Sequence, residues 1–315
     1  MTAAPALSKI ACGDLTRDLD LTSEELFAVL DLASDVKDSP EVYRSSLAGK
    51  SIALLFEKPS LRTRMTFELA IQQLGGFALV NEGRIGEREP LKDMARNLDR
   101  WVDAIVARTY LQKTVDGLAH WSKVPVINAL SDMFHPCQAL ADMQTIREHF
   151  GGSLGSMRGL KLAFVGDGNN MANSLMLNAA RLGMDFALAT PTKYEASGDI
   201  IAETRALAAR SGSELTVTND PAEAARGAHA IYTDVWASMG AENEVAERRT
   251  AFADYQVDDD LFTHAEPDAV FMHCLPAKRG EEVTDSVIES ARSVVFDQAE
   301  NRLHAQKALL LMLLS

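Results

Sequence analysis

Short apolar runs alternate with helical patterns along almost the whole chain, and this alternation restricts the fold more than any other feature. The apolar runs predict strands at residues 51–56, 77–80, 104–108, 124–128, 160–165, 185–189, 214–218, 230–233, 269–273 and 293–296. The segments between them predict helices at residues 23–36, 61–74, 91–102, 115–121, 137–150, 173–182, 199–211 and 221–226. Strands that alternate with helices form parallel sheets covered by helices, so the sequence predicts an α/β fold.

Chain length and one glycine-rich segment predict two domains. A chain of 315 residues is long for a single hydrophobic core. Residues 151–156, Gly-Gly-Ser-Leu-Gly-Ser, have the composition of a linker. We therefore expect one domain at residues 1–148 and a second at residues 149–299, each a mostly parallel sheet flanked by helices. A C-terminal helix at residues 300–315 is expected to pack back on the first domain, so that helices join the two.

Composition narrows the class of function. The net charge of −14 argues against a surface for nucleic acid or for a membrane. The N-terminus shows no signal-peptide pattern, and the apolar run at residues 308–314 is too short to span a bilayer. Three widely spaced cysteines fit neither a disulfide framework nor a zinc site, which favours a reducing, cytoplasmic location. Motifs for metals and cofactors are absent, and we expect neither.

The helix predicted after the first strand begins with charges of the unfavourable sign. Ser60 is a good N-cap, so the helix is expected to begin near Leu61. Helix starts are positive because their N–H groups are free, yet Arg62 and Arg64 occupy this first turn. A bound phosphate would explain the pattern, because N–H groups, hydroxyls and guanidinium groups would converge on it. The structural alternative is that Arg64 pairs with Glu68 and Arg62 is solvated.

Polar clusters follow several other predicted strands, at the strand ends where open α/β sheets bind ligands. Arg108 ends one strand, and residues 135–138 follow another through a loop. Residues 234–240 and 273–276 follow two strands of the second half. Taken singly, a histidine at a strand end is more often structural than catalytic, and Cys274 is more often an inert small side chain than a reactive thiol. Their occurrence together with the arginine pair favours a binding site.

A glycine-bearing turn, Gly166-Asp167-Gly168-Asn169-Asn170, invites a dinucleotide-binding interpretation. The third glycine of that motif would fall at Met171, and the next strand ends in Thr190-Pro191 instead of an acidic residue. We therefore reject this interpretation. The two asparagines either present donors to a carboxylate or simply cap the helix, and the residues leave both alternatives open.

Taken in order, the motifs resemble those of the aspartate/ornithine carbamoyltransferase family along nearly the whole chain. Ser60-Leu61-Arg62-Thr63-Arg64 is similar to the family's Ser-x-Arg-Thr-Arg motif, and His135-Pro136-Cys137-Gln138 is similar to its His-Pro-x-Gln motif. Three further segments resemble motifs of the ornithine-specific branch: Asp234-Val235-Trp236-Ala237-Ser238-Met239-Gly240, His273-Cys274-Leu275-Pro276 and Ala299-Glu300-Asn301-Arg302.

The resemblance implies transfer of the carbamoyl group from carbamoyl phosphate to the side-chain amine of L-ornithine, giving L-citrulline and phosphate. The implied route is an ordered ternary complex with no covalent intermediate. Residues implied to bind carbamoyl phosphate are Ser60, Leu61 through its backbone, Arg62, Thr63, Arg108, His135, Gln138, Cys274, Leu275 and Arg302. Residues implied to bind ornithine are Asn170, Asp234, Ser238 and Met239.

Catalytic roles follow from the same resemblance. Arg108 and His135 would polarise the carbonyl oxygen, and Cys274 with Asp234 would orient the amine. Gln138, with backbone carbonyls of the His-Cys-Leu-Pro motif, would receive the carbamoyl NH₂. The Leu275–Pro276 bond would be cis.

The resemblance also implies a homotrimer, or a multiple of trimers, in which the loop Asn81–Glu89 reaches a neighbouring active site. Arg84 in that loop stands where the family frequently has His. Leu61 stands where Thr is commoner, so one hydroxyl contact with phosphate would be lost.

Two alternatives to this function stay open from the residues. The first is carbamoyl transfer to another amine, putrescine or an N-acylated ornithine. The loop at residues 238–240 with Asp234 argues against putrescine, which has no α-carboxylate to bind. The second is a non-catalytic relative that binds only an anion or a partner. Arg108, His135 and Gln138 argue against it, because such a protein has no need of a carbamoyl site.

Overall fold

The computed structural model describes residues 9–152, 154–237 and 242–314. The chain divides into two compact units, Met1–Gln144 with Glu300–Ser315, and Thr145–Ala299. The chain passes between the units within two helices, α5 (Pro136–His149) and α12 (Val295–Leu314). The boundary expected between residues 148 and 149 also falls within α5.

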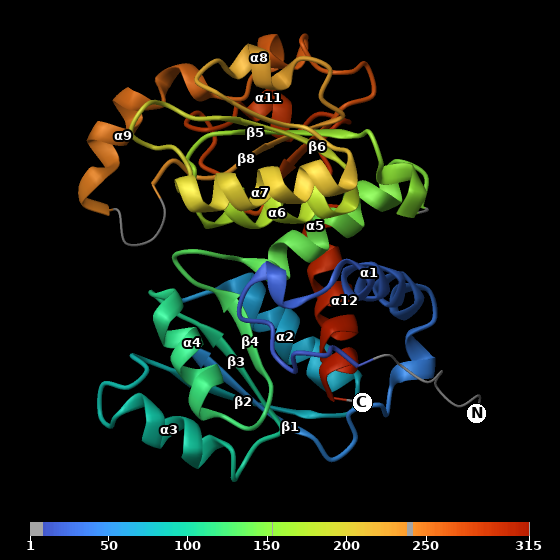
Figure 1. Cartoon of the computed structure of the whole chain (residues 1–315), viewed down its shortest axis with the longest axis vertical. Coiled ribbons are helices and arrows are strands. Elements are labelled where there is room, and N and C mark those ends of the chain that lie inside the picture. Colours follow the sequence, from blue (N-terminus) through green and yellow to red (C-terminus); the bar gives the residue numbers. More distant parts are fainter. Residues whose placement is uncertain (1–8, 153, 238–241, 315) are drawn as a thin grey trace. The chain divides into compact units, whose positions relative to one another are not determined.

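The first unit is built on a four-stranded parallel sheet with strand order β2-β1-β3-β4. The strands are β1 (Ser51–Phe56), β2 (Phe77–Glu82), β3 (Ala104–Arg108) and β4 (Val126–Leu130). The helices are α1 (Ser23–Asp38), α2 (Leu61–Gln73), α3 (Leu91–Leu98) and α4 (Gln112–Trp121), together with parts of α5 and α12. Figure 1 shows α3 and α4 on one face of the sheet and α1, α2 and α12 on the other. Apolar residues of α3 and α4 pack on strands β1 and β3. Strands β1, β3 and β4 are buried on both faces, whereas the edge strand β2 carries exposed side chains.

The second unit holds a five-stranded parallel sheet with strand order β7-β6-β5-β8-β9. The strands are β5 (Lys161–Val165), β6 (Asp185–Ala189), β7 (Leu215–Thr218), β8 (Ala230–Thr233) and β9 (Val270–His273). Helices α6 (Asn170–Leu182) and α7 (Gly198–Ser211) lie on one face, and α8 (Pro221–Ala225) and α11 (Asp285–Ile288) lie on the other (Figure 1). Helices α9 (Val245–Ala251) and α10 (Asp259–Phe262) complete this unit. Short 3₁₀ segments of the chain lie at Asp18–Asp20, Pro40–Tyr43, Leu154–Met157, Glu242–Glu244 and Ala253–Tyr255.

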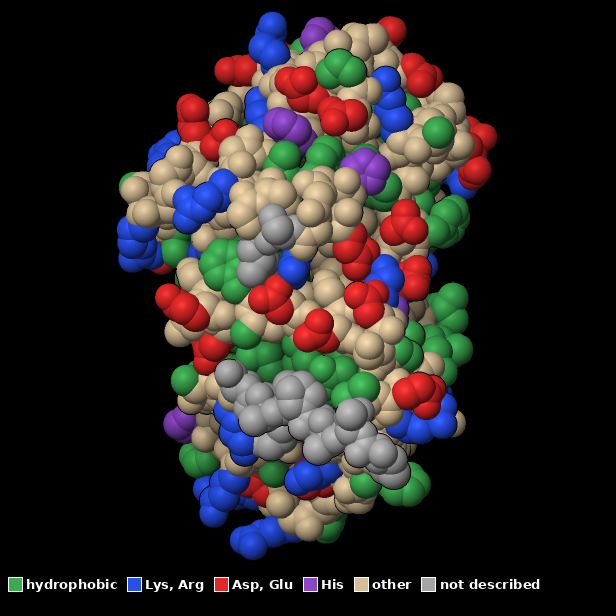
Figure 2. Space-filling model, turned by 90° about the vertical axis from the view of Figure 1, so that its right-hand side faces the viewer, with side chains coloured by type: hydrophobic (Ala, Val, Ile, Leu, Met, Phe, Trp, Pro, Cys, Tyr) green, Lys and Arg blue, Asp and Glu red, His purple; other side chains and the backbone are tan. Residues whose placement is uncertain are grey.

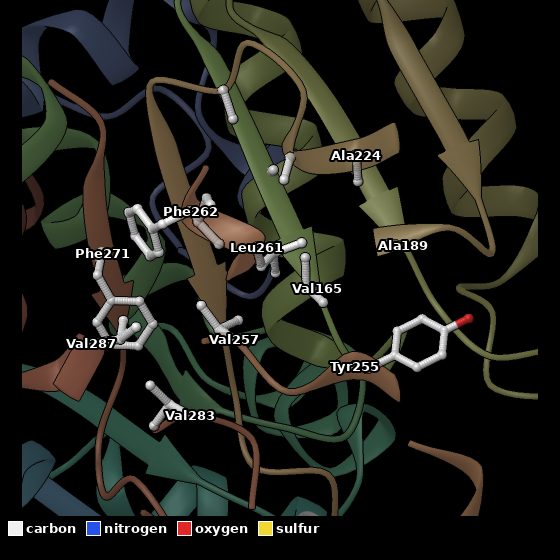
Figure 3. Packing of buried hydrophobic residues seen from close by; sticks show 14 of the residues in the cluster. Val165, Ala189, Ala224, Tyr255, Val257, Leu261, Phe262, Phe271, Val283 and Val287 are labelled. Carbon is white, nitrogen blue, oxygen red and sulfur yellow. The ribbon is translucent and has the colours of Figure 1, made fainter. Parts of the chain in front are cut away.

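The core of the second unit fixes the strands that lead to its polar loops. Val165 of β5 and Phe271 of β9 are fully buried in one cluster with Phe262 and Val287 from the covering helices (Figure 3). Tyr255 lies at the edge of this cluster, where its hydroxyl donates to the carbonyl oxygen of Asn219 at 2.6 Å. Burial of this much apolar surface holds the strand ends in place.

The predicted α/β class with two parallel sheets is confirmed, and most of the predicted strands are present. The strand predicted at residues 293–296 is wrong. Ser293 makes only an isolated bridge to Phe271, and helix α12 begins at Val295. An apolar run this short does not distinguish a strand from the first turn of a buried helix. The strand predicted at residues 124–128 lies instead at Val126–Leu130, because Pro125 has no N–H for the ladder.

Composition raises two expectations for the described residues, one about membranes and one about charge. None of the helices in the described ranges combines the length and hydrophobicity that crossing a bilayer requires. On the face drawn in Figure 2, acidic and basic side chains are interspersed, so the net charge of −14 is not gathered into one patch there.

Candidate active site

Each sheet has one point where the strand order reverses direction along the chain. In the first sheet this point lies between β1 and β3, and in the second it lies between β5 and β8. Open parallel sheets bind ligands outside the carboxyl ends of the strands at such points. The residues that follow these four strands are therefore the candidate functional residues of each unit, and we describe each unit by itself.

The start of α2 follows β1 and has the predicted geometry. The helix begins at Leu61, and the Ser60 hydroxyl caps it by accepting the Thr63 N–H at 3.3 Å. No acidic side chain lies in the first turn. Arg64 donates to Glu68 at 2.8 Å, as the structural alternative predicts for this residue, and it also donates to Glu82.

A buried hydrogen-bond chain joins α2, α12 and α5 within the first unit. Arg302 donates through Nη2 to the Thr63 hydroxyl at 3.0 Å and through Nη1 to Gln138 Oε1 at 2.6 Å. Gln138 Nε2 in turn donates to the Asp142 carboxylate at 2.7 Å. All four side chains are at most 2% exposed. Asp142 was not predicted, although its position one helical turn after Gln138 was a usable signal.

Burial and two nearby arginines favour the neutral form of His135. Arg108 ends β3 and His135 immediately precedes α5, and both are buried. Burial, together with the positive charges of Arg302 and Arg108, holds the pKa of His135 well below its usual value. A neutral imidazole can donate one hydrogen bond at physiological pH without carrying charge. Burial also raises the pKa of the Cys137 thiol to about 12, so this cysteine is chemically inert.

The loop after β2 is tied to the ends of β1 and β3. Glu57 accepts the N–H of Ile85 at 3.0 Å and the N–H of Tyr110 at 2.8 Å. The Tyr110 ring lies 4.7 Å from Lys58 Nζ and 5.4 Å from the Arg84 guanidinium carbon. Part of the predicted loop, residues 81 and 82, belongs to strand β2. The loop therefore starts from a fixed position at the carboxyl end of the sheet.

Asp234 organises the corresponding point of the second unit. This residue follows β8 and is buried. One carboxylate oxygen accepts the Asn169 side-chain N–H at 3.0 Å, and the other accepts the Cys274 thiol at 3.1 Å and the Val235 N–H at 2.8 Å. Asn169 also caps α6, because its Oδ1 accepts the Met171 N–H at 2.9 Å. The capping alternative therefore holds for Asn169, while Asn170 is the first residue of α6.

The segment after β9 is held by a buried histidine. His273 Nδ1 accepts the Leu275 N–H at 2.8 Å, so Nε2 carries the proton and lies 3.2 Å from Glu282. The Leu275–Pro276 bond is cis, as the resemblance implies. Ligand atoms of Asp234, His273 and Cys274 lie within 4.8 Å of one another, a spacing that suits a metal ion. Both ring nitrogens of His273 are already engaged, so a metal would have to displace one of these bonds.

Arg248 of α9 links two loops of the second unit, and the sequence analysis missed it. It donates to the Asp167 carboxylate and to the Trp236 carbonyl oxygen, both at 2.8 Å. Burial raises the pKa of Asp167 to about 6, although the Arg248 charge opposes the shift. The chain after Trp236 includes Ser238 and Met239, which lie outside the described residues.

The fold and the two polar clusters define a class: a two-unit α/β protein with a buried, arginine-containing cluster in one unit and a carboxylate–thiol cluster in the other. Comparison with known proteins narrows this class. Residues 14–148 match the model of the carbamoyl-phosphate-binding domain of aspartate/ornithine carbamoyltransferases. Residues 158–313 match the model of the aspartate/ornithine-binding domain of the same family.

Individual relatives agree along nearly the full length. The chain is 50% identical over 300 residues to an ornithine carbamoyltransferase of Carboxydothermus hydrogenoformans, covering 94% of this chain and 95% of that protein. It is 49% identical over 310 residues to an anabolic ornithine carbamoyltransferase of Pyrococcus furiosus, covering 97% of each. The solved structure of a Pyrococcus furiosus ornithine carbamoyltransferase has a TM-score of 0.93 at 48% identity, covering 98% of this chain and 99% of that one. The chain belongs to the aspartate/ornithine carbamoyltransferase family.

Proposed function

We propose that this chain transfers the carbamoyl group of carbamoyl phosphate to the side-chain amine of L-ornithine, releasing L-citrulline and phosphate. The observation that carries the proposal is the buried chain of Thr63, Arg302 and Gln138 beside a neutral His135. It offers fixed donors for a phosphate and a carbonyl oxygen, and an amide for a carbamoyl nitrogen. The relatives compared above are ornithine carbamoyltransferases, which favours ornithine over putrescine or an N-acylated ornithine.

The first unit supplies the proposed donor site. The ornithine nitrogen attacks the carbonyl carbon, the C–O bond to phosphate breaks, and negative charge develops on the carbonyl oxygen and on the leaving phosphate. Preorganised donors in a site without water stabilise such charges most. We assign the phosphate to Ser60, the Leu61 N–H, Arg62 and Thr63, and the carbonyl oxygen to Arg108, His135 and Thr63. Because His135 is neutral, it acts as a hydrogen-bond donor and not as an acid. Arg302 and Gln138 complete this site.

The second unit supplies the proposed acceptor site. A free side-chain amine has a pKa of ~10.4, so its neutral form costs on the order of 4–5 kcal/mol at pH 7. Removal of water lowers that cost. We assign the amine to Asp234 and Cys274, the carbamoyl NH₂ also to the Cys274 and Leu275 carbonyls, and the α-carboxylate and α-amine to Asn170, Asp234, Ser238 and Met239. The departing phosphate takes the proton that the amine loses.

These roles give the two parts of the chain their proposed names. Residues 1–148 with 300–315 are the carbamoyl-phosphate-binding domain, and residues 149–299 are the ornithine-binding domain. A cytoplasmic location is supported by three free cysteines, at positions 12, 137 and 274. Recovery of the native protein from a membrane or secreted fraction would contradict this location.

A single assay tests the function. The purified chain is mixed with carbamoyl phosphate and, separately, with ornithine, N-acetylornithine, putrescine and aspartate, and phosphate release is followed. We expect release with ornithine and a ureido product of the mass of citrulline. Phosphate release with putrescine or N-acetylornithine in place of ornithine would show that another amine is the acceptor substrate. No phosphate release with any amine would reject the proposed enzymatic function.

An apolar surface on the first unit supports the proposed trimer, or multiple of trimers. Leu61, Met65 and Leu69 lie at successive turns of α2 and are 75%, 48% and 36% exposed. Phe77 and Leu79 point to one side of the edge strand β2 and are 65% and 53% exposed. Large exposed apolar side chains at such spacing are typical of an interface. Leucine at position 61 adds to this surface, which gives its departure from threonine a physical reason. The Asn81–Glu89 loop follows β2, and we propose that it reaches the neighbouring site.

Replacing Met65 and Phe77 with aspartate is expected to leave a folded monomer, because two charges would have to be buried in the interface. Light scattering coupled to size-exclusion chromatography measures the mass. Trp101, which is 69% exposed on the same unit, provides the control when replaced with aspartate. A double variant that keeps the mass of the wild-type assembly would remove this surface from the interface.

A further inference from the structure

We propose that Asp142 is a positioning residue that fixes the acceptor oxygen of the Gln138 amide, and thereby selects carbamoyl phosphate over its methyl analogue, acetyl phosphate. This inference rests on the proposed carbamoyl transfer and deepens it. Asp142 lies one turn after Gln138 on α5, and its side chain is 0% exposed.

The chemistry of the two neighbours permits only one orientation of the amide. A carboxylate accepts hydrogen bonds and donates none, whereas a guanidinium donates and accepts none. Gln138 Nε2 therefore points to Asp142 at 2.7 Å, and Gln138 Oε1 points to Arg302 at 2.6 Å. The reversed amide would set its NH₂ against Arg302 and its oxygen against the carboxylate. Because both contacts are buried, neither mismatch is relieved by water.

The fixed oxygen decides which donor molecule fits. An amide oxygen has two lone pairs, and Arg302 occupies one of them. The carbamoyl group carries an NH₂ that can donate to the second, while the acetyl group has a methyl of similar size in the same place. A buried acceptor left facing a methyl group loses its hydrogen bond, and this is how polar sites reject isosteres.

A simpler role for Asp142 would be to balance the buried charge of Arg302. That role predicts that removal of the carboxylate weakens the binding of carbamoyl phosphate and of acetyl phosphate by the same factor, since both molecules carry the same phosphate. The positioning role predicts instead that the ratio of the two affinities changes. The ratio is therefore the decisive measurement.

The experiment compares the KM for carbamoyl phosphate with the inhibition constant of acetyl phosphate, at saturating ornithine. In the wild type we expect the two to differ at least about 10-fold, and a ratio near one would overturn the proposal without any variant. Asp142→Asn replaces a side chain that only accepts with one that can also donate, so Arg302 alone then fixes the Gln138 amide. We expect about a 10- to 100-fold loss in kcat/KM for carbamoyl phosphate with little change for acetyl phosphate. Asp18→Asn removes another buried carboxylate of the same unit, and we expect it to leave the ratio as in the wild type.

A swap of the two side chains tests the polarity directly. In Gln138→Glu with Asp142→Asn, the new amide donates to the new carboxylate, whose oxygens still accept from Arg302 and from a carbamoyl NH₂. The swap also keeps one buried carboxylate beside Arg302, as in the wild type, so the double variant is expected to fold. We expect the carbamoyl-to-acetyl ratio to recover to within about 5-fold of the wild type. A ratio that stays as low as in Asp142→Asn would overturn the proposal. Absence of any phosphate release by the wild type would instead reject the proposed function.

Discussion

Arg108→Met is expected to lower kcat/KM for carbamoyl phosphate about 100- to 1,000-fold, which is the usual effect of losing one donor to a developing oxyanion. Arg108 ends β3 at the point where the first sheet reverses direction, and it is buried. The methionine fills most of the arginine stem, so the loss is one of charge and not of packing. Steady-state kinetics at saturating ornithine measure the effect.

The same variant is also expected to change the pKa of His135, which a loss of packing alone would not do. Burial is the largest cause that depresses the pKa of His135, and the charges of Arg302 and Arg108 add to it. Removal of the Arg108 charge should therefore raise the pKa of His135, while burial and Arg302 still keep it below its ordinary value. NMR titration of the imidazole follows this shift. Arg44→Met, at an exposed arginine paired with Glu41, is the control for both measurements. An unchanged rate in Arg108→Met would remove this arginine from the proposed mechanism.

Asp234→Asn is expected to raise the KM for ornithine and to lower kcat/KM for ornithine about 100-fold. The substitution removes a buried carboxylate that accepts hydrogen bonds from three donors. The amide that replaces it can accept through only one of its two ends, so at least one donor among Asn169, Cys274 and Val235 is left facing an NH₂. The KM for carbamoyl phosphate should stay within about 2-fold, since its phosphate contacts are assigned to the other unit.

Two further variants make this result specific. Cys274→Ser keeps a donor to Asp234, and we expect a smaller loss than in Asp234→Asn. Asp199→Asn, in the first turn of α7, changes an exposed carboxylate of the same unit and should leave ornithine kinetics unchanged. Equal losses in the affinities for both substrates would mean that Asp234 only stabilises the fold.

The strands were predictable because buried parallel strands are short apolar runs between helices, as at Ser51–Phe56 and Asp185–Ala189. The start of α2 was predictable because its signals are local: a capping hydroxyl at Ser60 and no helix before it. Of the two residues that were not predicted, only Arg248 is linked to its partner over a long stretch of chain. Arg248 lies far along the chain from Asp167, which it contacts. No local pattern encodes such a pairing, whereas a contact one turn away, as for Asp142, follows from helical spacing.

The first unit is not a continuous stretch of chain, because the second unit is inserted between its main part and Glu300–Ser315. Arg302, which joins Thr63 to Gln138, therefore leaves the ribosome only after the whole second unit. During synthesis, the sheet of the first unit and the whole second unit are available before Thr63 and Gln138 meet Arg302. A premature stop anywhere before residue 302 therefore leaves Thr63 and Gln138 without the guanidinium that joins them.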